Sequence, residues 1–208
     1  MSFVEPQTSD RRKLLSVNRA YFLSRKPARL ESVLPASIFV TDPNRTPDPV
    51  SIARQLPQGS GILYRHFGKN DRFTIGEELK IIARKNRLKL IISHDPKLAD
   101  FIQPDGVHWP KKYIRHFLQH KRFYKLNTCS AHSFRQISNA GKLNFDACFV
   151  SAVFPSRSPS APNAMGPAKL RFLCQESQIP IYGLGGLNPK NAHAIIQHAG
   201  YAGVDGFT

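Results

Sequence analysis

The feature that most constrains the fold is a regular alternation, from Leu34 onward, of short apolar runs with longer amphipathic stretches. Runs rich in β-branched and aromatic residues predict buried strands, and the amphipathic stretches between them predict crossover helices. Strands that alternate with helices in this way form a parallel sheet. The expected strands are residues 37–41, 61–64, 88–93, 106–109, 124–129, 147–153, 180–184 and 203–207.

The stretches between these runs are expected to be helices, and several begin near a proline, which the first helical turn accepts without losing a hydrogen bond. The expected helices are residues 49–56, 75–86, 96–102, 112–120, 133–143, 167–177 and 189–199. Eight strands in a chain of 208 residues favour a closed (β/α)8 barrel, or TIM barrel, over an open doubly wound sheet. Because the sequence ends close behind the eighth run, we expect it to lack the last helix of the barrel.

The segment before the first strand differs in composition from the rest. Residues 1–33 combine many basic side chains with apolar ones such as Leu14, Leu15 and Phe22. We interpret this segment as a basic helical extension, and residues 34–208 as one barrel domain. A transit peptide or a membrane-surface helix is the less favoured interpretation.

The charge balance is strongly basic, with 30 Lys and Arg against 14 Asp and Glu and a net charge of +16. Such a surface attracts nucleic acid, anionic membranes and phosphorylated small molecules by the same Coulomb force. The basic residues are spread along the chain, and the aromatic residues are not spaced like a stacking platform. Binding of nucleic acid is therefore not favoured, and phosphorylated small molecules are the expected partners. The oligomeric state is left open.

Neither a membrane anchor nor a disulfide framework is indicated. No apolar run reaches the roughly 18 residues of a membrane span, and the N-terminus lacks the apolar region of a secretory signal. The cysteines Cys129, Cys148 and Cys174 lie far apart, in a pattern that encodes neither paired disulfides nor a zinc site. We expect a cytoplasmic protein that binds no membrane.

Polar side chains gather where the predicted strands end, which is where barrels of this kind carry their functional groups. An Asp before a proline often caps a turn or helix, so a capping role is the alternative to a functional one for Asp42 and Asp95. A single His is usually structural, but three at successive strand ends indicate a site. The candidate residues at these ends are Asp42, Arg65, His66, His94, Asp95, His108, His132, Ser156, Arg157 and Ser158.

The segment 181–189, with the sequence IYGLGGLNP, is the strongest single motif. Gly183, Gly185 and Gly186 would let the backbone approach a phosphate closely, and the helix expected to follow would add its positive end. We therefore predict a phosphate-binding site here. The alternative is a tight turn capped by Asn188.

Taken in order, these motifs resemble the thiamine phosphate synthase and thiazole tautomerase (TenI) family over about residues 34–208. The motifs that carry the resemblance are Thr41-Asp42, LIISHD at 90–95, PDGVH at 104–108, SAHS at 130–133, VFPS at 153–156, Gly166 and GLGGL at 183–187. The resemblance implies an enzyme that joins a hydroxymethylpyrimidine diphosphate to a thiazole phosphate with Mg²⁺.

It also implies roles for single residues. Arg65 and His132 would be catalytic, Arg65 by holding the diphosphate, and Asp95 would be the Mg²⁺ ligand. The phosphates would be bound by Gly183, Gly185, Gly186, Ser156, Arg157, Ser158 and His108.

The chain also departs from the family pattern. Synthases follow the strand-four His with Gly-Gln and an acidic metal ligand, whereas residues 109–113 read WPKKY. In addition, Phe67 replaces a lysine and His94 replaces an asparagine. The missing carboxylate raises the hypothesis of a metal-independent thiazole tautomerase, in which His132 moves the proton. A phosphate-binding paralogue without turnover is the third hypothesis, and a nucleic-acid-binding protein the last.

Overall fold

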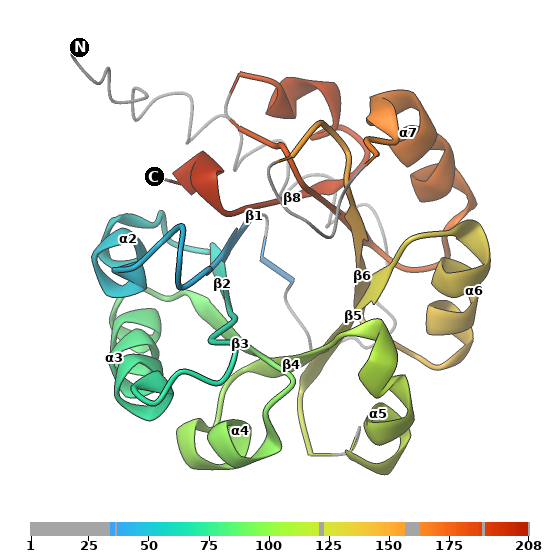
Figure 1. Ribbon diagram of the computed structural model, residues 1–208. Helices are drawn as coiled ribbons and strands as arrows, with labels where there is room; N and C mark the ends of the chain where they lie inside the picture. Colours follow the sequence, from blue (N-terminus) through green and yellow to red (C-terminus); the bar gives the residue numbers. More distant parts are fainter. Residues whose placement is uncertain (1–33, 36, 121–122, 157–162, 189, 208) are drawn as a thin grey trace.

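A computed structural model of the protein describes residues 34–35, 37–120, 123–156, 163–188 and 190–207. The described chain forms a closed barrel of eight parallel strands surrounded by helices (Figure 1). This confirms the predicted (β/α)8 architecture. The helical extension expected at residues 1–33 lies outside the described residues. Within the described ranges, no helix has the length and apolar character needed to cross a bilayer.

Each strand pairs with the next along the chain, and β8 pairs with β1 to close the barrel. At the closure Ile38 of β1 lies opposite Ala202 of β8. Strands that are buried on both faces read as continuous apolar runs, which is why most of them could be located from the sequence. The strands are β1 (Ser37–Val40), β2 (Gly61–Tyr64), β3 (Lys89–Ser93), β4 (Gly106–Trp109), β5 (Leu126–Ala131), β6 (Ala147–Ser151), β7 (Ile181–Leu184) and β8 (Gly200–Gly203).

The helices lie on the outside of the barrel (Figure 1). They are α2 (Pro49–Gln55), α3 (Arg72–Lys85), α4 (Pro96–Ile102), α5 (Ile114–His120), α6 (Phe134–Lys142) and α7 (Gly166–Glu176), and a 3₁₀ turn, η1 (Lys111–Tyr113), precedes α5. The side chains of Asp48, Asp95 and Ser133 cap α2, α4 and α6 by accepting hydrogen bonds from backbone N–H groups. Each cap satisfies a donor that the first helical turn leaves without a partner.

The structure corrects the last quarter of the prediction. Among residues 190–199, where a helix was expected, it forms only the 3₁₀ turn η2 (Ala192–Ala194) and further turns. The eighth strand was expected at 203–207 but lies at Gly200–Gly203, and the 3₁₀ turn η3 (Asp205–Phe207) follows it. The buried pair Tyr201 and Ala202 forms the strand, because these two residues pair with Ser37 and Ile38 of β1.

Side chains fill the interior of the barrel, so it is a packed core and not a channel. Alternate residues of the strands, among them Ile38, Leu63, Ile91, Phe149 and Tyr182, contact one another there. The rings of Phe149 and Tyr182 stack at 4.9 Å, and the Tyr182 hydroxyl donates a hydrogen bond to the carbonyl oxygen of Pro35 at 2.6 Å. Within the described residues, these contacts leave the interior packed with side chains.

Candidate functional site

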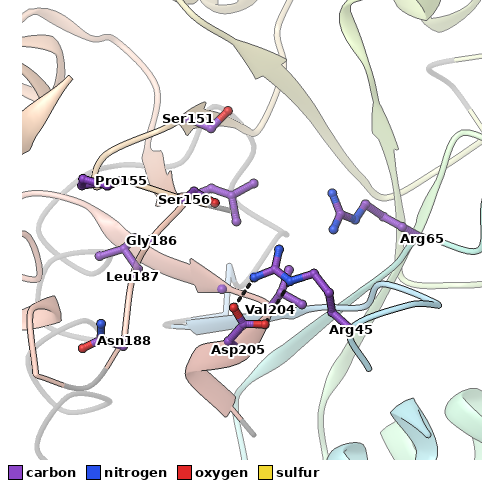
Figure 2. Close-up of a pocket in the computed structure, with 13 residues that line it drawn as sticks. Arg45, Arg65, Ser151, Pro155, Ser156, Gly186, Leu187, Asn188, Val204 and Asp205 are labelled. Atoms are coloured by element: carbon purple, nitrogen blue, oxygen red, sulfur yellow. Dashed lines mark hydrogen bonds and ion pairs between the residues drawn. The ribbon is translucent and has the colours of Figure 1, made fainter. Parts of the chain in front are cut away.

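A cavity of about 310 Å³ lies at the carboxyl ends of the strands (Figure 2). Arg65 extends into it from the end of β2 and Arg45 from the loop after β1, while the turn after β7 forms the opposite wall. The lining residues are Arg45, Arg65, Ser151, Pro155, Ser156, Leu184, Gly185, Gly186, Leu187, Asn188, Gly203, Val204 and Asp205. Two cations therefore face a glycine turn across a space that fits a small molecule.

The glycines of that turn are required by their surroundings. Gly185 and Gly186 have φ angles of +92° and +64°, which side chains rarely adopt. A Cβ on Gly186 would lie 2.3 Å from the carbonyl oxygen of Pro155, and one on Gly185 would lie 2.8 Å from the Cβ of Ala152. The turn after β7 thus packs directly against the loop after β6. Both glycines line the cavity where the sequence predicted a phosphate site.

Gly183 has a different role from the one predicted. It lies within β7, and a Cβ there would come within 2.8 Å of Ile195 Cδ1 and 3.1 Å of Leu170 Cδ2. Both of those side chains are buried in the core between the sheet and the outer layer of the barrel. The lack of a side chain at Gly183 therefore serves packing outside the barrel, away from the cavity.

The positive helix end expected after Asn188 is also absent from the described residues. The side-chain oxygen of Asn188 accepts hydrogen bonds from the N–H groups of Lys190 and Asn191, at 2.9 and 3.2 Å. The amide of Asn191 in turn donates to the carbonyl oxygen of Gly186 at 2.9 Å. This is the capped tight turn that was the alternative interpretation. The positive charge at the cavity wall is therefore that of Arg45 and Arg65.

Arg65 is held in place by the end of β1. Its Nε donates to the carbonyl oxygen of Thr41 at 3.0 Å, and its terminal nitrogen lies 3.5 Å from a carboxylate oxygen of Asp42. The hydroxyl of Thr41 also donates to the Arg65 carbonyl oxygen, at 2.9 Å. Burial lowers the pKa of Arg65, while the charge of Asp42 opposes that shift. A guanidinium keeps its proton in proteins, so Arg65 presents a fixed positive charge to the cavity.

Arg45 and Asp205, which were not among the predicted site residues, form an ion pair at the cavity wall (Figure 2). The Nε of Arg45 donates to one carboxylate oxygen of Asp205 at 3.0 Å, and a terminal nitrogen contacts the other. Arg45 follows β1 and Asp205 follows β8, so the pair spans the closure of the barrel. No local motif marks either residue, since the two are 160 positions apart.

His108 lies inside the barrel, on β4. Its Nδ1 is 3.0 Å from the hydroxyl of Thr128 and its Nε2 is 2.9 Å from that of Ser130. Burial lowers the pKa of His108 to about 3, and the nearby charge of Arg65 adds to this effect. The ring is therefore neutral at physiological pH, and it belongs to the buried framework beneath the site.

His132 contacts a residue of the cavity wall, and Ser156 belongs to that wall. His132 is exposed, and its Nδ1 lies 3.2 Å from the carbonyl oxygen of Ser151, a residue of the cavity wall. Its backbone N–H donates to the side chain of Gln136 at 2.8 Å, which fixes the start of the loop. Ser156 itself lines the cavity. Arg157 and Ser158, also predicted to bind phosphate, lie outside the described residues.

Asp95, the predicted metal ligand, has partners on both carboxylate oxygens. Oδ1 accepts a hydrogen bond from the N–H of Leu98 at 3.0 Å and so caps α4. Oδ2 accepts one from Arg72 Nε at 3.1 Å and lies 3.3 Å from His66 Nε2. In the part of the chain that the structure describes, no group of three or more His, Cys, Asp or Glu could hold a metal ion. The residues present therefore do not fit the Mg²⁺ site that the family implies.

Aromatic rings and a lysine lie in residues 109–113 and beside them, where the family has its second carboxylate. The ring of His94 stacks on Tyr113 with centroids 3.6 Å apart, and Lys112 Nζ lies 4.7 Å from the centroid of the Tyr113 ring. The Nε2 of His94 is 3.1 Å from Nδ1 of His116. Burial is the main cause that lowers the pKa of His94, and His116 contributes. Aromatic rings and a lysine thus occupy this corner, where Mg²⁺ would need oxygen ligands.

Comparison with known proteins decides the family. Residues 38–207 match the family described as thiamine monophosphate synthase. The chain belongs to this family. Both the predicted membership and the predicted barrel are therefore confirmed.

Individual relatives support the same family. The chain is 28% identical over 165 residues to the thiamine-phosphate synthase of Geobacillus thermodenitrificans, an alignment that covers 74% of this chain and 73% of the relative. It is 25% identical over 189 residues to a Bacillus cereus thiamine-phosphate synthase, covering 86% and 84%. Among solved structures, the thiamine phosphate pyrophosphorylase of Pyrococcus furiosus has a similar fold, with a TM-score of 0.69, 20% identity and coverage of 82% and 85%.

Proposed function

We propose that this protein acts in thiamine biosynthesis as a thiamine-phosphate synthase-like transferase, which joins a pyrimidine diphosphate to a thiazole monophosphate. The observation that carries the proposal is the cavity in which Arg65 and Arg45 face the Gly185–Gly186 turn. Family membership supports the class of substrates.

The cavity offers complementary features to a phosphate ester. Gly185 and Gly186 line the cavity with main-chain atoms alone, so an anion in the cavity meets backbone there and no side chain. Arg65 supplies a positive charge whose position is set by Thr41 and Asp42. Arg45 supplies a second one, part of which Asp205 neutralises. This arrangement favours a phosphorylated ligand over a neutral one.

In the proposed reaction the bond between the methylene carbon of the pyrimidine and the diphosphate oxygen breaks, and its electrons leave with the diphosphate. The ring nitrogen of the thiazole forms the new bond to that carbon. Arg65 stabilises the negative charge that develops on the departing oxygen, an electrostatic effect that in enzymes is worth roughly 3–4 kcal/mol per donor. The cavity holds the thiazole phosphate, so that its nitrogen is oriented for attack.

Because the residues present do not fit a Mg²⁺ site, another group has to neutralise the departing diphosphate. In the family the metal neutralises the departing diphosphate, but here Asp95 is bound to Arg72 and the corner near Tyr113 carries lysine. We therefore assign the neutralisation of the diphosphate to arginine side chains.

The same observation favours a second candidate function, a thiazole tautomerase. A tautomerase moves one proton within the thiazole phosphate and needs neither a metal nor a diphosphate pocket. His132, whose Nδ1 lies 3.2 Å from the carbonyl oxygen of the wall residue Ser151, would accept and return that proton. A protein that binds the phosphate without turnover is the remaining outcome.

The test is to assay both reactions with purified protein, with and without EDTA, in wild type and in His132→Asn. A tautomerase should lose roughly 10²- to 10⁴-fold in rate in His132→Asn, because the proton carrier is gone. A transferase should lose only part of its rate there and much more in Arg65→Gln. The matched control is His193→Asn, since His193 is an exposed histidine in the 3₁₀ turn η2, a segment that contributes no residue to the cavity wall.

Each result selects one function. Formation of thiamine phosphate from both substrates supports the transferase, and isomerisation of the thiazole phosphate alone replaces it with the tautomerase. Binding of thiazole phosphate without either reaction leaves the non-catalytic binder. If neither activity nor phosphate binding is found, the proposal is wrong. Salt-dependent binding to duplex DNA would then indicate a nucleic-acid-binding protein, as the basic charge suggests.

A further inference from the structure

Two histidine side chains meet at the corner between β3 and α5. His94 follows β3 and His116 lies in α5, and Nε2 of His94 is 3.1 Å from Nδ1 of His116. Neither residue lines the cavity that holds Arg65, and the proposed reaction uses neither of them. A small ion can reach the pair from solvent, since His116 is exposed and His94 is half-buried.

The surroundings hold the ring of His94 in place. It stacks on the ring of Tyr113 with centroids 3.6 Å apart and an angle of 5° between the planes. The ring of Trp109 meets it edge to face, with centroids 5.4 Å apart and an angle of 63°. His116 is carried by the helix α5. Two imidazole nitrogens are therefore brought close together before a ligand arrives, which lowers the entropy that binding costs.

The spacing of the two nitrogens suits a shared hydrogen, and it also suits a shared metal ion. Imidazole nitrogens lie about 2.0–2.1 Å from a bound metal, so two of them 3.1 Å apart subtend an angle of about 100° at the ion. Square-planar, octahedral and tetrahedral ions all accept two neighbouring ligands near this angle. The hydrogen between the rings would move to the outer nitrogen of its own ring, so neutral rings bind the ion without losing a proton.

The donor atoms select the class of metal. Mg²⁺ takes oxygen ligands, whereas imidazole suits Cu²⁺, Ni²⁺ and Zn²⁺, and nitrogen sites bind Cu²⁺ most tightly among these ions. The ammonium group of the nearby Lys112 has no lone pair to offer. Across the described residues no group of three His, Cys, Asp or Glu forms, so water would fill the remaining positions around the ion.

We propose that Nε2 of His94 and Nδ1 of His116 bind one divalent transition-metal ion, with Cu²⁺ favoured over Ni²⁺ and with water as the other ligands. The bound ion links the end of β3 to α5. This inference goes beyond the proposed function, because it concerns a separate site and a different class of ligand.

The test is to titrate Cu²⁺, Ni²⁺ and Mg²⁺ into the protein, prepared without a histidine tag, and to follow calorimetry and tryptophan fluorescence. Trp109 is the one tryptophan of the chain, and its ring contacts that of His94. Cu²⁺ bound at His94 should therefore quench its emission. Wild type should bind one Cu²⁺ per chain, Ni²⁺ more weakly and Mg²⁺ without saturation.

The variants remove one nitrogen at a time. His94→Phe keeps a ring that can stack on Tyr113 but has no ligand atom, and His116→Gln removes the other imidazole. Each should weaken Cu²⁺ binding by about 10- to 100-fold or more, since loss even of a residue that only supports a ligand has an effect of that size. The matched control is His193→Gln, because His193 is an exposed histidine in η2 and should not affect the isotherm.

Several results would overturn the proposal. Wild type without saturable Cu²⁺ binding, or unchanged affinity in His94→Phe, would show that the two histidines share only a hydrogen. Equal losses in His116→Gln and His120→Gln, with none in His94→Phe, would place the ion on α5 alone. A loss in His193→Gln would place it elsewhere.

Calorimetry with inorganic phosphate on the same samples keeps the two proposals apart. Wild type that binds phosphate but not Cu²⁺ retains the proposed phosphate site and overturns the metal site. Wild type that binds Cu²⁺ through His94 and His116 but not phosphate supports the metal site and overturns the phosphate site.

Discussion

Arg72 donates a hydrogen bond from its Nε to Oδ2 of Asp95 at 3.1 Å, which joins the first residue of α3 to the residue that caps α4. Asp95 is the carboxylate that the family resemblance assigns to Mg²⁺. A divalent cation at this position would have to displace a guanidinium, and in the described part of the chain it would find no group of three or more His, Cys, Asp or Glu. The ion pair with Arg72 thus occupies the carboxylate oxygen that a metal at the end of β3 would need.

The first prediction is that the ligand-free protein binds Mg²⁺ only weakly, with no saturation in calorimetry below about the millimolar range. Arg72→Gln should strengthen Mg²⁺ binding, because it frees Oδ2 of Asp95 and removes a positive charge. Arg87→Gln is the control, since Arg87 is exposed in the turn between α3 and β3. A tight isotherm in wild type that disappears in Asp95→Asn would show that Asp95 is a metal ligand after all.

The second prediction concerns the turn after β7. Gly186→Ala should lower the free energy of unfolding by about 2–4 kcal/mol and abolish phosphate binding, because its Cβ would lie 2.3 Å from the Pro155 carbonyl oxygen. Gly59→Ala is the control: Gly59 also has a positive φ, of +85°, but its Cβ would meet nothing within 4 Å. It should cost only about 1–2 kcal/mol, for backbone strain.

Urea denaturation and calorimetry with inorganic phosphate measure both effects. Equal destabilisation in the two variants would mean that the close approach of the turn to the loop after β6 contributes nothing.

The barrel was predictable because most of its strands are buried on both faces and therefore read as apolar runs; β2 and β4 have the predicted bounds. The eighth strand was misplaced because the residues of Gly200–Gly203 include no β-branched side chain, whereas Val204 and Phe207 resemble a strand. The helix expected after Asn188 does not form, for a different reason. The side chain of Asn188 accepts hydrogen bonds from the backbone just after it, and such bonds compete with a helix.

The site was only partly predictable. The rule that function gathers at strand ends identified Arg65, Ser156 and the turn at Gly185 and Gly186, all of which line the cavity. The same motif includes Gly183, but a glycine needed for packing cannot be told from one needed for a ligand without its neighbours. The pair of Arg45 and Asp205 could not be foreseen, since only closure of the barrel brings them together.

The third prediction is a pH dependence of stability that comes from His108. Its pKa is lowered from 6.5 to about 3 in the folded protein, so between these values the unfolded chain binds more protons than the folded one. Stability from this group is complete above about pH 6.5 and is lost as the pH falls toward 3, by at most about 1.4 kcal/mol per pH unit.

Urea denaturation at several pH values between 8 and 4 measures this slope. His108→Gln should flatten it, although a smaller slope should remain because burial also lowers the pKa values of His66 and His94. An unchanged slope in His108→Gln would show that His108 is not the group whose protonation opposes folding.

The fourth prediction concerns the separate effects of Arg45 and Asp205, the ion pair at the cavity wall, on phosphate affinity. Asp205→Asn should tighten the binding of inorganic phosphate about fivefold, because it removes a negative charge from the wall, and Arg45→Gln should weaken it by a similar factor. The magnitude follows from a Coulomb energy of about 1 kcal/mol for two unit charges roughly 4 Å apart in water.

Asp105→Asn is the control, because Asp105 pairs with Lys89 at the opposite end of the barrel, at 2.9 Å, and should leave phosphate affinity unchanged. Both effects should shrink as salt is raised, since salt screens exposed charges. If Asp205→Asn weakens phosphate binding instead, the carboxylate matters because it positions Arg45, and repulsion of the anion is the smaller effect. The two variants then act in the same direction, and that agreement would show that the intact ion pair contributes to phosphate binding.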